Sequence, residues 1–129
     1  MPSRFRLTSY KPKVAESHIA KACVQILALR GWKVLRLPVG LFKTMDCRHT
    51  SIGELGIPDY VALHPDYPGF FLEVKRPGGK LSKVQEIKIE QLQQGYRLAV
   101  AVVDSPDALA AWLHKHELSA FIRINNNAR

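Results

Sequence analysis

The sequence is poor in several features on which common protein classes depend. It has only two cysteines, Cys23 and Cys47, which form no C-x-x-C pair and no disulfide framework, so a reducing environment is expected. No apolar run approaches the roughly 20 residues that cross a bilayer, and the N-terminal segment contains no apolar stretch typical of a signal peptide. A glycine-rich phosphate loop and a serine–histidine–aspartate arrangement are also missing. These absences disfavour secreted, membrane, P-loop and serine-hydrolase classes, and they predict a cytoplasmic protein.

Acidic residues are scarce relative to basic ones. Eleven Asp and Glu face nineteen Lys and Arg in 129 residues, which gives a net charge of +8. Such an excess indicates a polyanionic partner, of which nucleic acid is the commonest, although a merely solvated basic surface is the alternative. The length suits one domain with a real core, and a hydrophobic content of 47% is typical of a globular chain.

The pattern of apolar and turn-forming residues predicts one α/β domain over residues 14–124. Elements are expected in the order α-β-β-β-α-β-α, with helices packed against a sheet. The predicted helices cover residues 14–30, 82–94 and 105–116, and the predicted strands cover residues 32–37, 59–64, 69–75 and 96–103. The remaining segments are predicted as a basic arm (1–13), a long irregular stretch (38–57) and a frayed tail (125–129).

Two neighbouring predicted strands carry charges that a sheet does not need. If they pair antiparallel about Asp66, then Asp59 lies opposite Glu73 on the same face, with Cβ atoms about 4.5–5.5 Å apart. Carboxylates this close repel each other unless a proton or a cation lies between them. A hard divalent cation prefers such oxygen ligands, and Lys75 could orient a nucleophile or stabilise charge at a phosphodiester. The spacing therefore predicts a metal site suited to phosphodiester hydrolysis.

Each of these residues has a simpler explanation when it is considered alone. Asp59 could be an ordinary acid at a strand start, and Glu73 and Lys75 could lie on the solvated face of an edge strand. Glu16, which falls in the apolar arc of the first helix, could merely favour the positive end of that helix. Gln85 could serve only the S-x-x-Q capping box that opens the second helix. The combination of all five favours one site.

"PD" followed by "EVK" resembles the P-D…(D/E)-x-K signature of the restriction-endonuclease-like nuclease superfamily. More narrowly, "GIPDYVAL" with "FLEVKRPGGKLSKVQ" is similar to the VRR-type nuclease domain, over about residues 14–103. That domain occurs alone in phages and bacteria, and at the C-terminus of a Fanconi-anaemia-associated repair nuclease. The resemblance implies a mixed central sheet flanked by helices, in a protein of a bacterial or phage-infected cell.

The resemblance also implies roles for individual residues. Asp59, Glu73 and the backbone carbonyl of Val74 would bind Mg²⁺ or Mn²⁺. Lys75 would be the catalytic lysine, Glu16 the helix-borne acid and Gln85 a further motif residue. The residues implied to act in catalysis are therefore Glu16, Asp59, Glu73, Lys75 and Gln85.

Basic residues near this motif are candidate contacts to DNA phosphates. They lie just after the E-x-K motif or in the long segment before the P-D motif, and each could equally be a solvated surface charge. These residues are Arg76, Lys80, Lys83, Lys88, Lys43 and Arg48. No helix-turn-helix or RNA-binding motif is present, so sequence-specific base reading is not expected.

The combined expectation is a Mg²⁺- or Mn²⁺-dependent, structure-selective DNA endonuclease, and the resemblance implies cleavage that leaves a 5′-phosphate. Lone members of the similar family resemble Holliday-junction resolvases in being homodimers, and one site per chain makes a homodimer attractive for cutting two strands. A Holliday-junction-resolving enzyme is therefore the first expectation. A flap or general DNA nuclease is the alternative within the same class. A non-catalytic DNA-binding module that retains the fold is the alternative from another class, whereas a basic protein-interaction domain would leave the paired acids unexplained.

Overall fold

The computed structural model describes residues 15–38, 40–43 and 49–127. The predicted basic arm, residues 1–13, lies outside the described residues, as does Arg48. Within the described part, no helix is long and apolar enough to cross a membrane.

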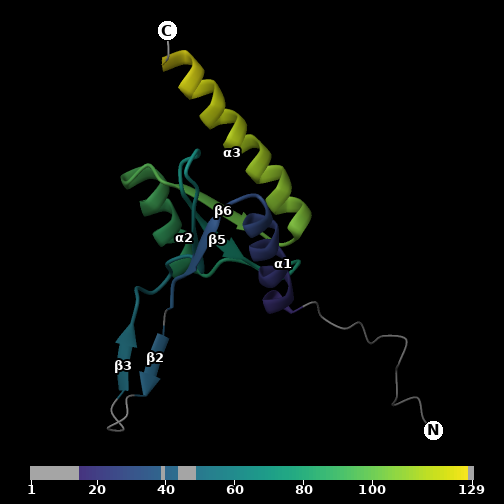
Figure 1. Cartoon of the computed structure of the whole chain (residues 1–129). Coiled ribbons are helices and arrows are strands. Elements are labelled where there is room, and N and C mark those ends of the chain that lie inside the picture. The colour runs from purple at the N-terminus through teal and green to yellow at the C-terminus, as the bar shows by residue number, and fades with distance from the viewer. Residues whose placement is uncertain (1–14, 39, 44–48, 128–129) are drawn as a thin grey trace, which may run out of the picture.

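A four-stranded mixed sheet forms the centre of the domain, as the sequence predicts (Figure 1). Its strands, in spatial order, are β1 (Lys33–Arg36), β4 (Tyr60–Leu63), β5 (Phe70–Val74) and β6 (Ala99–Val103). Strand β4 runs antiparallel to both β1 and β5, whereas β6 runs parallel to β5. The parallel pair is possible because a helical crossover returns the chain to the end of the sheet where β5 begins.

The register between β4 and β5 is the one that the turn at residues 65–69 predicts. Tyr60 pairs with Leu72, and Val61 pairs with Phe71. One step beyond this ladder, Asp59 and Glu73 lie opposite each other at the end of the two strands. A slip of one residue would have sent the two acids to opposite faces of the sheet.

Helices cover both faces of the sheet (Figure 1). The helices α1 (Glu16–Leu29) and α3 (Pro106–Asn127) pack on one face, and α2 (Lys83–Glu90) with the π-helical segment η2 (Gln91–Gly95) packs on the other. The larger core lies under α1 and α3, because α1 presents a stripe at helical spacing. That stripe consists of Ile19, Cys23 and Leu27, all of them buried.

The long segment between β1 and β4 differs from the sequence prediction. It was predicted to be irregular, but it contains an antiparallel hairpin of β2 (Gly40–Lys43) and β3 (His49–Ile52). Figure 1 shows this hairpin extending away from the main sheet. Strands as short as four residues, one of them opened by glycine, leave too little periodic pattern to be recognised in a sequence.

The C-terminal elements also differ from their predicted bounds. Strand β6 begins at Ala99 rather than at residue 96, because the chain first leaves the π-helical segment and Leu98 N donates to Leu92 O at 2.9 Å. Helix α3 continues past the predicted end at residue 116 to Asn127, so residues 125–127 of the predicted frayed tail are helical. No glycine or proline stands between residues 107 and 127 to stop the helix.

Two leucines of α1 provide a test of this packing. Leu27 is fully buried, whereas Leu29, two residues later, is 88% exposed. We expect Leu27→Ala to lower the free energy of unfolding by about 2–5 kcal/mol, because it leaves a cavity in the core. Leu29→Ala should change it by about 0.5 kcal/mol or less. Urea unfolding of both variants measures this, and equal losses would contradict the orientation of α1.

Candidate active site

At the end of the β4–β5 pair, the backbone N–H groups donate to side-chain carboxylates instead of to backbone carbonyls. The Asp59 amide donates to Glu73 Oε2 at 3.1 Å, and the Val74 amide donates to Asp59 Oδ2 at 3.3 Å. On its other side, Asp59 O accepts a hydrogen bond of 2.8 Å from Leu37 N, at the end of β1. The two acids therefore continue the cross-strand ladder by one step and fix each other in place.

Glu73 is the one buried charged residue among those described, with 2% of its surface exposed. Its Oε1 atom accepts a hydrogen bond from Gln85 Nε2 at 2.7 Å and lies 3.6 Å from Lys75 Nζ. The lysine side chain is itself only 16% exposed. A buried carboxylate is tolerated only where such partners satisfy its oxygens.

Gln85 serves both of the roles that its position in the sequence allows. It completes the capping box of α2 with Ser82: its backbone N–H donates to Ser82 Oγ at 3.2 Å, and its side-chain Oε1 accepts from the Ser82 backbone N–H at 2.9 Å. Its side-chain nitrogen points the other way and binds Glu73. The helix cap thus determines how the glutamine is oriented, and the glutamine in turn holds the carboxylate.

Burial and the neighbouring negative charge of Asp59 raise the pKa of Glu73 from its ordinary value of 4.5 to about 7. Lys75 opposes this shift by favouring the charged form, but it does not cancel it. The folded protein therefore stabilises the charged form of Glu73 less well than water does. A proton on Glu73, or a cation beside it, would relieve the repulsion from Asp59.

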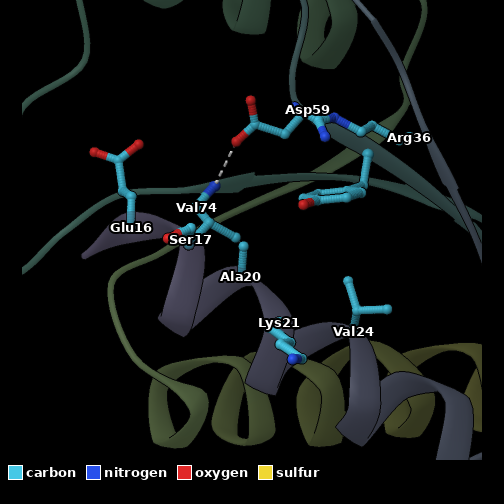
Figure 2. Close-up of a pocket in the computed structure, with 9 residues that line it drawn as sticks. Glu16, Ser17, Ala20, Lys21, Val24, Arg36, Asp59 and Val74 are labelled. Atoms are coloured by element: carbon cyan, nitrogen blue, oxygen red, sulfur yellow. Dashed lines mark hydrogen bonds between the residues drawn. The ribbon is translucent and has the colours of Figure 1, made fainter. Parts of the chain in front are cut away.

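Two hollows flank Asp59. The first, of about 540 Å³, lies between α1 and the sheet, and it is lined by Glu16, Lys21, Arg36 and Val74 in addition to Asp59. Figure 2 shows the carboxylates of Glu16 and Asp59 on either side of the Val74 amide.

The second hollow, of about 490 Å³, lies on the side of α2 and is lined by Arg36, Gly56 and Gln85 together with Asp59. Asp59 therefore borders both hollows, whereas Glu73 and Lys75 are not among the described residues that line either of them.

The structure brings together four of the five predicted catalytic residues, namely Asp59, Glu73, Lys75 and Gln85. Glu16 lies across the first hollow, exposed on the first turn of α1. One residue beside the site was not among those predicted from the sequence. Arg36 lines both hollows. It lies at the end of β1 and pairs with Tyr60, the residue that follows Asp59, and its place at the end of a predicted strand was the only signal in the sequence.

The residues predicted to contact DNA differ in their exposure and in their ion pairs. Arg76, Lys80 and Lys83 are exposed beside the site, with Lys83 only 3.9 Å from Glu86 of the same helix. Lys88 instead forms an ion pair of 2.8 Å with Glu54, and only 18% of its side chain is exposed. The side chain of Lys43 lies outside the described part, as Arg48 does.

The oxygens at the sheet end are of the type that hard divalent cations prefer. The donors available are the carboxylates of Asp59 and Glu73 and the carbonyl of Val74. Among the described residues no group of three or more His, Cys, Asp or Glu is close enough to enclose an ion. Two carboxylates with an incompletely balanced charge nonetheless suit Mg²⁺, which commonly binds through one or two carboxylates and keeps several waters.

Glu73 makes the stability of the metal-free protein depend on pH. Between pH 4.5 and about 7 the folded protein keeps a proton that the unfolded chain loses, so the free energy of unfolding falls as pH rises through this window. The shift corresponds to about 3 kcal/mol at most. In EDTA, Glu73→Gln should abolish this part of the profile, and the exposed Glu90→Gln should retain it. Parallel profiles for wild type and Glu73→Gln would contradict the shift.

Gly56 allows the segment before Asp59 to approach α2. Its φ is +82°, and a Cβ atom there would lie 2.7 Å from the carbonyl oxygen of Val84. We expect Gly56→Ala to displace the segment and to lower the free energy of unfolding by about 1–3 kcal/mol. Gly95→Ala is the matched control, because nothing lies within 4 Å of its Cβ position. Thermal unfolding of both variants checks this, and a smaller loss for Gly56→Ala would contradict it.

Comparison with known proteins identifies the family of the chain. The family model described as the VRR-NUC domain matches residues 9–105, which include every strand, α1 and α2. No significant match is found among curated proteins, and none is found among solved structures. The match covers most of the chain and includes the carboxylate pair, its lysine and its glutamine. The chain therefore belongs to the VRR-NUC family, a nuclease domain of the restriction-endonuclease-like superfamily.

Proposed function

We propose that this nuclease domain is a Mg²⁺- or Mn²⁺-dependent DNA endonuclease that hydrolyses phosphodiester bonds in branched DNA. The observation that carries the proposal is the pair of carboxylates with Lys75 beside the buried Glu73, while Asp59 lines two hollows. A purely structural ion pair would not require a second acid whose charge opposes the first.

The residues would divide the chemistry among them. Asp59, Glu73 and the Val74 carbonyl would hold the cation, which when bound supplies an acidified water and offsets charge on the phosphoryl oxygens. Gln85 keeps Glu73 in its orientation through the bond of 2.7 Å. Lys75, whose Nζ lies 3.6 Å from the same carboxylate, would orient the attacking water or stabilise developing charge.

Residues around the site would hold the DNA. Arg76, Lys80 and Lys83 are exposed on the segment that joins β5 to α2 and at the start of that helix. Arg36 lines both hollows and would face a phosphate that enters either of them. Contacts of this kind neutralise the backbone without reading bases, which suits an enzyme that recognises DNA shape.

The proposed substrate class is one in which two strands are cut symmetrically. Each chain carries one carboxylate pair, so symmetric cutting of two strands requires two chains related by a twofold axis. A Holliday-junction-resolving homodimer meets this requirement. A flap or general nuclease would use the same residues but would need only one chain.

Cleavage of labelled DNA tests this proposal. Wild type should make paired cuts in a four-way junction with Mg²⁺ or Mn²⁺ and none in EDTA. Lys75→Ala should reduce the rate by about 100- to 1,000-fold, and Glu73→Ala should abolish cutting. Glu90→Gln, on the exposed side of α2, is the matched control and should cut as wild type does.

The controls separate the candidates. Duplex, flap and single-stranded substrates run beside the junction distinguish a junction enzyme from a flap or general nuclease. Wild type that binds these DNAs but cuts none of them with either metal would overturn the enzyme and leave a DNA-binding module.

A further inference from the structure

A third hollow lies at the end of the sheet opposite the carboxylate pair. It has a volume of about 450 Å³ and lies between the connection from η2 to β6 and the helix α3. Pro68 and Gly69, just before β5, line it, whereas Val74 at the end of β5 lines the first of the two hollows beside Asp59. Five strand residues therefore separate the two places, about 17 Å along the sheet.

The described residues that line this third hollow include two arginines and no acidic residue. Arg97 and Arg123 reach it from different elements, and Gln93 and Ser119 add polar groups. No carboxylate is among the described residues that line it, and within the same part of the chain neither arginine forms an ion pair. His116 also lines it, held by a bond of 2.7 Å between its Nε2 and Pro68 O.

The backbone on one side of the hollow is unusual. Arg97 has a φ of +56° and is the one non-glycine residue among those described with a positive φ. Glycine or asparagine would adopt this conformation more readily, so an arginine here indicates that its side chain contributes something. The π-helical turn that carries Gln93 precedes it, and such turns occur frequently at functional sites.

We propose that this hollow binds a phosphate group of a nucleic acid, as a second contact remote from the cut. Guanidinium groups are suited to this ligand, because each can donate two parallel hydrogen bonds to phosphate oxygens. The separation of about 17 Å corresponds to about five base-pair steps along the axis of a duplex. The inference rests on the proposed function in taking DNA as the ligand, and it extends the footprint to the far end of the domain.

The first test observes the arginines directly. The side-chain Nε–Hε signals of Arg97 and Arg123 are followed by NMR while inorganic phosphate is added in the absence of metal, and then with a short oligonucleotide with or without a 5′-phosphate. We expect both signals to shift with inorganic phosphate and with at least one oligonucleotide. A response only to the 5′-phosphorylated strand assigns the hollow to a strand end, and an equal response to both strands assigns it to backbone diesters. Unchanged signals in all three titrations would overturn the inference.

The second test measures DNA binding in EDTA as a function of salt. Arg97→Gly with Arg123→Gln removes both guanidinium groups, and glycine suits the backbone at residue 97. We expect this double variant to bind a branched DNA about 10-fold more weakly and to reduce the salt slope by about 2. Lys33→Gln with Lys115→Gln removes the same charge from exposed positions that do not line the hollow, and it should stay within about 3-fold of wild type.

The outcomes are separable from those of the cleavage experiment. If the two double variants weaken binding equally, general charge explains the loss and the inference fails. Signal shifts and selective weakening in a protein that cuts no DNA would support the phosphate site and overturn the nuclease proposal. Thermal unfolding of each variant shows that the fold is retained before binding is compared.

Discussion

The reciprocal hydrogen bonding between Asp59 and the end of β5 is the constraint on which the site depends. Each carboxylate accepts a hydrogen bond from a backbone N–H of the opposite strand: Glu73 from Asp59 at 3.1 Å, and Asp59 from Val74 at 3.3 Å. The two carboxylates are therefore held close together by the sheet itself, before any cation is bound. The closeness of the two acids destabilises their charged forms, and this contributes to the raised pKa of Glu73. It also preorganises a pair of oxygen ligands.

The features that the sequence could predict are those set by local rules. The turn at residues 65–69 fixes the β4–β5 register, and hence the facing of Asp59 and Glu73. The capping box follows from Ser82 and Gln85 three residues apart. Both are decided by spacing within a short segment, so they can be inferred from the sequence without knowledge of the tertiary structure.

The features that could not be predicted depend on packing between distant segments. Arg36 lies near the site because β1 pairs with β4, a strand more than twenty residues later in the chain. The left-handed conformation of Arg97 follows from the way the helical segment is joined to β6, and arginine gives no local signal for it. The bond from Gln85 to Glu73 spans twelve residues, and it requires α2 to pack against the sheet as it does.

The bond from Gln85 links the buried carboxylate of Glu73 to the end of a helix, where backbone opening is easiest. The first turn of α2 is closed by the same glutamine that orients Glu73. Fraying of this turn therefore also releases one of the groups that hold Glu73, while the Asp59 amide still holds the other carboxylate oxygen. Hydrogen exchange at the Gln85 backbone amide would then report on the fraction of molecules in which the glutamine holds the acid.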